Sequence, residues 1–227
     1  MQETANLTPV KKRPLHRMIW QFVRSTIYFW VPAFLFLVLA NEVGEKEPLP
    51  GDVAILNGIH TFSSDWLDRF FLLVTSLGSA PFVIAGVTVA ITAMYYIGEK
   101  RNALFLLFSA GGTAIINILF KLLFERERPD LWEHLVIESG YSFPSGHAMI
   151  SSALALAIII LAWRTEYRWH AIIIGSLYTL LVGISRVYLG VHFPSDIIGG
   201  WCVSILWILT LYHVFARFTG RARLSAK

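Results

Sequence analysis

Charge is scarce in this chain. Asp, Glu, Lys and Arg make up 15% of its 227 residues, whereas soluble domains carry roughly a quarter. Hydrophobic residues make up 56% and the mean hydropathy is +0.59, which excludes an ordinary soluble domain. The single cysteine, Cys202, excludes an internal disulfide. Internal repeats, low-complexity runs and Pro/Gly-rich linkers are lacking as well. We therefore expect residues 1–227 to form one membrane domain.

Six stretches are apolar enough to cross a bilayer, which takes about 20 residues as a helix. They are 23–41, 70–97, 102–124, 147–163, 169–188 and 196–216. The predicted fold class is all-α, a polytopic membrane bundle of about six transmembrane helices. Gly78-Ser79-Ala80-Pro81 interrupts the long second stretch, where we expect a tilt, a kink or an interfacial start. A cleaved signal ending near Ala40 is an alternative for the first stretch, although that stretch is long enough to span.

A short apolar pattern follows the first stretch. Val53, Ile55, Leu56, Ile59 and Phe62 recur at helical spacing after Asp52, a candidate helix cap. This pattern predicts a short interfacial helix in the first outer loop. A solvated loop is the alternative.

The basic residues indicate how the chain lies in the membrane. The net charge of +4 is not spread along one face, so nucleic-acid binding is not indicated. Lys and Arg instead lie near the start of the first stretch, between the second and third, between the fourth and fifth, and after the sixth. Because positive residues favour the cytoplasmic side, we expect both termini in the cytoplasm. The loops after the third and fifth stretches then face outside.

Three polar blocks stand at the outer ends of these stretches. They read Lys121-Leu-Leu-Phe-Glu-Arg-Glu-Arg128-Pro129, Tyr141-Ser-Phe-Pro144-Ser145-Gly146-His147, and Ser185-Arg186-Val-Tyr-Leu-Gly-Val-His192-Phe-Pro-Ser-Asp196. A cation at membrane depth costs about 2.5–3.5 kcal/mol on insertion scales, so such cations usually have a partner. Lys121, Arg128 and Arg186 are therefore candidates for binding an anion, whereas Arg126 fits a side chain that anchors a helix end.

The second and third blocks suit phosphate chemistry. Ser145 precedes an apolar run and is expected to cap a helix whose free N–H groups bind anions, with Gly146 allowing close approach. His192 and Asp196 are one helical turn apart, with Pro194 suited to the first turn. Such an Asp can hold the proton on one imidazole nitrogen and leave the other as a nucleophile. In isolation, either pattern would more often be an ordinary helix cap.

Together the blocks resemble the signature of the type 2 phosphatidic acid phosphatase family, over roughly the C-terminal half of the chain. The resemblance implies an integral membrane lipid phosphatase that forms a phosphohistidine and needs no metal or other cofactor. His192 would be the nucleophile, Asp196 its orienting partner and His147 the general acid. The residues implied to bind phosphate are Lys121, Arg128, Ser145, Gly146 and Arg186. For Ser185 we expect only a hydrogen bond to phosphate or to a neighbouring loop.

The implied substrate is a phospholipid or polyprenyl phosphate in the outer leaflet. Phosphatidic acid and phosphatidylglycerol phosphate are the leading classes, with undecaprenyl diphosphate as the alternative, and the loop from Asp130 to Gly140 is expected to influence the choice. The vanadium-dependent haloperoxidases share this pocket but are soluble, which the apolar stretches argue against. A transporter or scaffold would explain the helices but not the histidines. Asp130 and His134 have the spacing of a metal pair but lack obvious further ligands.

Overall fold

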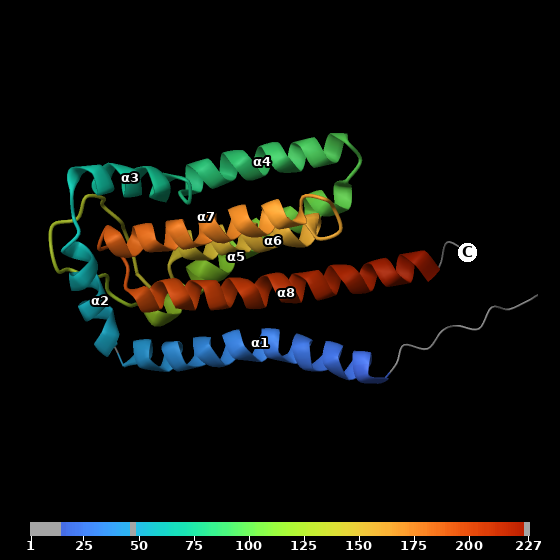
Figure 1. Ribbon diagram of the computed structural model, residues 1–227, viewed down its shortest axis with the longest axis horizontal. Coiled ribbons are helices and arrows are strands. Elements are labelled where there is room, and N and C mark those ends of the chain that lie inside the picture. The colour runs from blue at the N-terminus through green and yellow to red at the C-terminus, as the bar shows by residue number, and fades with distance from the viewer. Residues whose placement is uncertain (1–14, 46–48, 225–227) are drawn as a thin grey trace, which may run out of the picture.

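The protein is a bundle of helices. The computed structural model describes residues 15–45 and 49–224, and within these ranges the regular structure is entirely α-helical. The helices are α1 (Leu15–Gly44), α2 (Pro50–His60), α3 (Asp65–Ser76), α4 (Ala80–Tyr96), α5 (Lys100–Phe124), α6 (Gly146–Ala162), α7 (Arg168–Tyr188) and α8 (Pro194–Leu224). This confirms the all-α prediction (Figure 1). The basic positions 11–13 and 227, used above to orient the chain, lie outside the described residues.

Length and composition support a membrane location for most of the bundle. In the described part, α1 from Thr26, α5, α7 and α8 to Arg217 are each long and apolar enough to span. The α3 and α4 helices pass that test only as a pair and are bent by 44° at their junction. The α6 helix is apolar but has 17 residues, about 26 Å at 1.5 Å per residue. The described helices thus give four spans, or five with the bent pair.

The break between α3 and α4 occurs where the sequence predicted it. Pro81 lies in the first turn of α4, where its missing N–H costs no hydrogen bond. Gly78 lies against α6 and α7, and a Cβ at this position would come within 2.8 Å of Val182 Cγ1 and 3.1 Å of His147 Cδ2. Tyr178 donates its hydroxyl to the Leu77 carbonyl at 2.9 Å. The kink is therefore packed directly against a predicted site residue.

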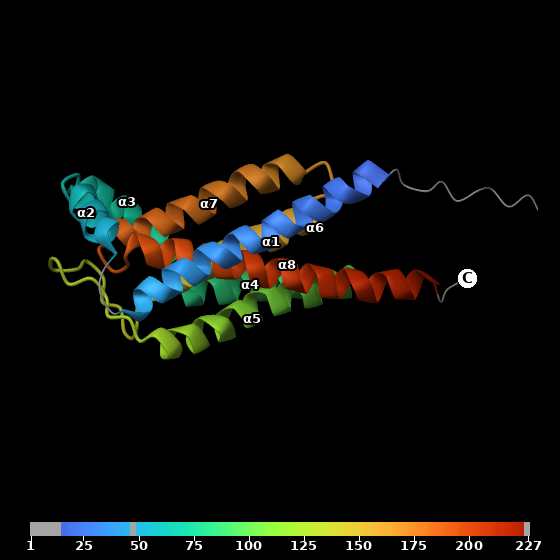
Figure 2. The same cartoon turned by 90° about the horizontal axis from the view of Figure 1, so that it is seen from below.

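Small side chains let the central helices come close together. The inward face of α6 is made of buried Ala and Ser residues, and the helix packs against α5, α7 and α8. Gly175 of α7 would place a Cβ 3.2 Å from that of Ala155. Close packing of small residues is the usual way for membrane helices to associate. The α1 helix lies across α8 (Figures 1 and 2). In Figure 2, α5 and α7 lie on opposite sides of α8.

The two ends of the bundle are formed by different helix ends and loops. The beginning of α1 and the end of α8 lie at one end, while α2, the 125–145 loop and the beginning of α8 lie at the other, which we call the motif end (Figure 1). The predicted short helix exists as α2, but the predicted cap is wrong. Leu49 is the N-cap residue, and Asp52 lies in the first helical turn with its side chain buried.

Candidate active site

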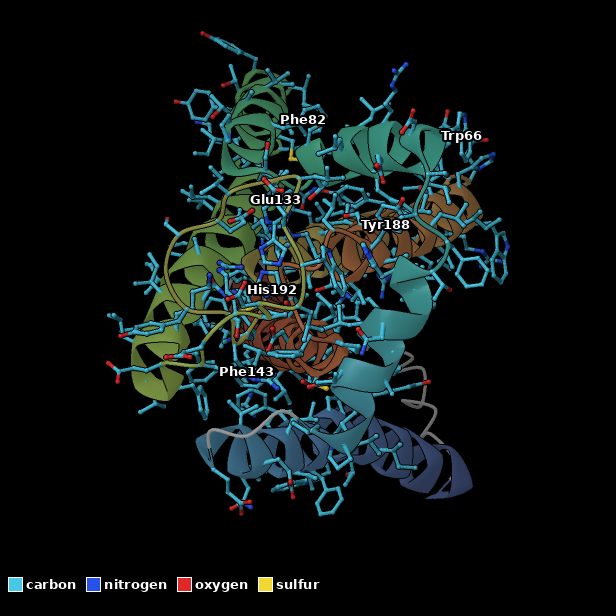
Figure 3. All side chains as sticks on the ribbon, turned by 90° about the vertical axis from the view of Figure 1, so that its left-hand side faces the viewer. Trp66, Phe82, Glu133, Phe143, Tyr188 and His192 are labelled. Carbon is cyan, nitrogen blue, oxygen red and sulfur yellow. The ribbon has the colours of Figure 1, made fainter. Side chains whose placement is uncertain are left out.

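The fold brings the three sequence blocks together at the motif end. The first block ends α5 and enters the 125–145 loop, the second leads into α6, and the third joins the end of α7 to the beginning of α8. Figure 3 looks onto this end and shows His192 near its centre. His192, Asp196, Ser145 and Arg186 are all buried. Residues that are far apart in the sequence thus form one polar cluster at the end of an apolar bundle.

The His192 ring is held at both nitrogens. Its Nδ1 lies 3.2 Å from Asp196 Oδ2, which also accepts the Phe193 N–H at 2.9 Å. Its Nε2 lies 3.1 Å from Nη1 of Arg128. Because a guanidinium only donates, Nε2 acts as the acceptor and the ring proton is on Nδ1, facing the carboxylate.

This tautomer suits a nucleophile. Burial lowers the pKa of His192 well below its usual value of 6.5, and the nearby cations Arg186, Arg128 and Lys121 lower it further. The ring is therefore neutral at physiological pH, and the Nε2 lone pair faces the cations. A buried base oriented by a carboxylate is the arrangement found in triad-type catalysis.

The start of α6 forms the opposite wall. Ser145 is the N-cap residue, as predicted, and its hydroxyl accepts the Ala148 N–H at 3.5 Å. Its own N–H donates to the Asp196 carbonyl at 3.1 Å. Asn117 of α5 donates to the Pro144 carbonyl at 2.9 Å, and a Cβ on Gly146 would come within 3.0 Å of the Asn117 amide oxygen. Asn117, which the sequence analysis did not single out, thus positions this helix start.

Arg128 and Arg186 are two of the three cations predicted to bind an anion, and different kinds of hydrogen bond hold them in place. Arg128 is held by loop carbonyls, donating to Gly140 at 3.0 Å and to Val191 at 2.9 Å. Arg186 is 1% exposed and donates to Thr75 Oγ1 at 2.6 Å. Its Nε finds no acceptor among the described residues. A buried donor without a partner is costly, so this guanidinium can take a further acceptor.

Glu138 lies beside two of the cations predicted to bind an anion. Its carboxylate forms an ion pair with Arg186 and lies 3.9 Å from Nη2 of Arg128. Burial alone would raise the pKa of Glu138, but Arg186, His147 and Arg128 attract the carboxylate and lower that pKa overall. Glu138 therefore carries a negative charge, so a carboxylate already lies beside cations suited to a phosphate. The sequence placed Glu138 in the loop that influences the head group but did not distinguish it from its neighbours.

Arg126 corrects one prediction. It is 6% exposed and does not anchor a helix end at the surface. Its Nη1 donates to Asp196 Oδ1 at 2.5 Å, and its Nη2 donates to Asp52 Oδ2 at 2.9 Å. Ser195 joins the same network, accepting from Arg126 at 2.7 Å and donating its N–H to Asp52 at 3.0 Å. Sequence reasoning missed this role because the two carboxylates lie in segments distant from Arg126.

Three smaller expectations from the sequence concern Ser185, the pair Asp130 and His134, and Pro194. Ser185 was expected to bond to phosphate or to a loop, but its hydroxyl donates to the Val182 carbonyl within α7 at 2.6 Å. Asp130 and His134 do not belong to a metal cluster in the described residues, where no group of three His, Cys, Asp or Glu side chains could hold an ion. Pro194 does begin α8, as its spacing predicted.

Comparison with known proteins agrees with this geometry. A family model described as the PAP2 superfamily matches residues 102–219, which is more than half of the chain. The chain belongs to the PAP2 superfamily. It is a membrane lipid phosphatase of that family, in which the phosphohistidine mechanism and independence of metal ions are general properties. This confirms the family resemblance and excludes the transporter and scaffold alternatives.

Relatives cover most of the chain. It is 32% identical to phosphatidylglycerophosphatase B of Bacillus subtilis (strain 168), over 79% of this chain and 91% of that protein. It is 27% identical to an undecaprenyl-diphosphatase of Sulfolobus acidocaldarius, over 80% of this chain and 87% of that protein. A crystal structure of a transmembrane PAP2 type phosphatidylglycerolphosphate phosphatase from Bacillus subtilis matches with a TM-score of 0.76 and 28% identity. That match covers 84% of this chain and 97% of the other.

Proposed function

We propose that this phosphatase hydrolyses a phospholipid monoester of the phosphatidic acid or phosphatidylglycerol phosphate type, using His192 as its nucleophile. The observation that carries the proposal is the pair of contacts at the His192 ring. Nδ1 faces Asp196 and Nε2 faces Arg128, so the unprotonated nitrogen points toward a cation that could hold the phosphoryl group. The similarity to phosphatidylglycerophosphatase B of Bacillus subtilis favours a phosphatidylglycerol phosphate type substrate.

The proposed reaction has two steps. The Nε2 lone pair attacks phosphorus while the bond from phosphorus to the lipid oxygen breaks, and His147 gives that oxygen a proton. His147 then takes a proton from a water molecule as that water attacks phosphorus and the bond from phosphorus to Nε2 breaks. This step releases inorganic phosphate and leaves His192 neutral and His147 protonated again. Lys121, Arg128 and Arg186, with Ser145 and the Gly146 N–H, offset the charge that develops on the phosphoryl oxygens.

Undecaprenyl diphosphate is the second candidate substrate. Two of the similar proteins are undecaprenyl-diphosphatases, and a diphosphate carries an additional phosphoryl group for the cations to bind. The bond that breaks would then join the two phosphoryl groups. Its leaving group is a phosphate oxygen, which needs less protonation by His147 than a lipid alkoxide does.

The proposed topology has six crossings and a site on the non-cytoplasmic face. It takes the bent α3–α4 pair as one crossing and α6 as a short one, with α2 lying at the interface. Lys100 and Arg168 begin α5 and α7, at the ends away from the polar blocks. The positive-inside rule assigns those ends to the cytoplasm, which gives the site access to lipids of the outer leaflet.

A substrate panel tests the proposed activity. Phosphate release from phosphatidic acid, phosphatidylglycerol phosphate and undecaprenyl diphosphate is measured with the purified protein in detergent, in excess chelator. We expect turnover of at least one monoester in the wild type and none in His192→Ala. Full activity in His192→Ala would overturn the proposed nucleophile. Turnover confined to the diphosphate would establish the second candidate instead.

Labelling with a membrane-impermeant thiol reagent tests the topology. Cys202→Ser removes the only cysteine, and Glu133→Cys and Glu166→Cys are then made separately in that background. We expect labelling of intact cells at position 133, and labelling at position 166 only after permeabilisation. The reverse pattern would place the site in the cytoplasm.

A further inference from the structure

A buried charge network connects α2 to the carboxylate beside His192. Asp52 comes from α2, Arg126 from the loop after α5, and Asp196 from the first turn of α8. All three side chains are at most 6% exposed. Because Asp52 precedes residues 102–219, it lies outside the segment that matches the family model. The network therefore links one residue outside the matched segment, Asp52, to Arg126 of the first block and Asp196 of the third.

The contacts give Asp196 a partner at each oxygen. Oδ2 accepts hydrogen bonds from His192 Nδ1 and from the Phe193 N–H. These two contacts set the orientation of the carboxylate relative to the imidazole. Among the described residues, only Arg126 donates a hydrogen bond to Oδ1. A carboxylate at 0% exposure needs such a cation to remain ionised, because burying an unpaired charge costs several kcal/mol.

Arg126 in turn is held by α2. Its second nitrogen binds Asp52, and its guanidinium lies 4.3 Å from the centre of the Phe193 ring. Asp52 also accepts the Ser195 N–H and hydroxyl, which fixes α2 to the first turn of α8. Removing Asp52 would therefore leave Arg126 with a single carboxylate and loosen its position against Asp196.

We propose that Arg126 and Asp52 are positioning residues, which hold Asp196 ionised and aimed at His192 so that the Nε2 lone pair stays available to attack phosphate. This role rests on the proposed function of His192. Neither residue touches the cations that would bind the phosphoryl group. Their loss should therefore slow the chemical step and leave substrate binding nearly unchanged.

A double-mutant cycle tests this coupling. The wild type, Arg126→Met, Asp196→Asn and the double variant are assayed with an activated aryl phosphate, so that lipid preference does not enter. We expect Arg126→Met to lower kcat about 10- to 100-fold, a loss within the range of coupling energies between contacting residues. KM should stay within about twofold of the wild-type value. In the Asp196→Asn background the same substitution should cost less than about twofold. Arg126→Lys, which keeps the charge, should recover part of the lost kcat.

Asp52→Asn removes the charge of the side chain but keeps its shape. It provides a second test of the network if Arg126→Met does not fold. We expect it to lower kcat about tenfold with KM unchanged. Asp68→Asn is the matched control, because Asp68 fixes α3 to Tyr188 of α7 at 2.6 Å without contacting the network. It should leave kcat within about twofold, and thermal unfolding of every variant confirms that it is folded.

The possible outcomes separate the two proposals. Equal losses from Arg126→Met with and without Asp196→Asn, or an unchanged kcat in Asp52→Asn, would overturn the positioning role alone. A rise in KM with kcat unchanged would do the same, because it would make Arg126 a substrate-binding group. Activity that survives His192→Ala would instead overturn the proposed nucleophile, and the positioning role with it.

Discussion

Two groups of charged side chains lie side by side at the motif end and differ in their net charge. In the support group, Arg126 is shared by Asp52 and Asp196, so carboxylates outnumber cations by one. In the cation-rich group, Lys121, Arg128 and Arg186 have only Glu138 in common, so cations outnumber carboxylates by two. The first group already has its counter-ions, whereas the second is suited to a dianion. Charge balance, rather than residue type, distinguishes the arginine proposed to support the site from those proposed to bind phosphate.

The largest expected effect concerns the protonation of the leaving group that is proposed for His147. His147→Ala should lose about 10²- to 10⁴-fold more activity toward a lipid alkoxide leaving group than toward an activated aryl phosphate, the usual range for general acid catalysis. The ratio of kcat/KM values for the two substrates measures it. Equal losses on both substrates would remove His147 from the acid role.

Removing one phosphate-binding cation should come next in size. Arg186→Met should lower kcat/KM about 10²- to 10³-fold, the scale of losing one donor to a developing oxyanion. Inhibition by vanadate, which resembles the transition state, should weaken in parallel.

Asp52→Asn sharpens this contrast with the support group. It should leave the vanadate inhibition constant unchanged, because the Asp52 side chain accepts hydrogen bonds only from Arg126 and Ser195 among the described residues. Similar shifts in both variants would mean that the two groups act as one.

Reducing the carboxylate count of the cation-rich group should have a smaller effect in the opposite direction. Glu138→Gln removes the charge that competes with phosphate and should lower the vanadate inhibition constant about fivefold, or ~1 kcal/mol. Glu133→Gln, an exposed residue of the same loop, is the matched control. Weaker inhibition in Glu138→Gln would show that Glu138 orients Arg186 instead of competing with the substrate.

The smallest expected effect is on stability as a function of pH. Because the pKa of His192 in the folded protein lies well below 6.5, its contribution to stability is complete above about pH 6.5 and is lost as the pH falls toward the folded value. The wild-type Tm should therefore fall more between pH 7 and 5.5 than that of His192→Gln. Parallel falls would mean that His192 accepts a proton while folded.

The sequence predicted the local features of the site better than the contacts between distant segments. The order of apolar stretches placed all three blocks at one end of the bundle, and local helix chemistry correctly assigned Ser145 as a cap and Pro194 to a first turn. These features depend on residues that are near one another in the chain. The break near Gly78 was predicted for the same reason, but its packing against His147 was not.

What the sequence could not predict depends on tertiary contacts. Asp52 and Arg126 are 74 positions apart, and each has an ordinary local interpretation, one as a helix cap and the other as an anchor at a helix end. Only the packing of α2 across the motif end brings them together. Glu138 lies in a loop without regular structure, so no periodicity indicated which of its polar residues points inward.

The ion pair between Glu138 and Arg186 also bears on how the enzyme completes its cycle. Cations that stabilise the phosphoryl group in the transition state also hold the inorganic phosphate that remains and slow its departure. In the proposed cycle, the Glu138 carboxylate can return to the Arg186 guanidinium as the product leaves, so that this guanidinium keeps an anionic partner. Product release then becomes an exchange of one anion for another, and the cost of separating bare charges in a buried site is avoided.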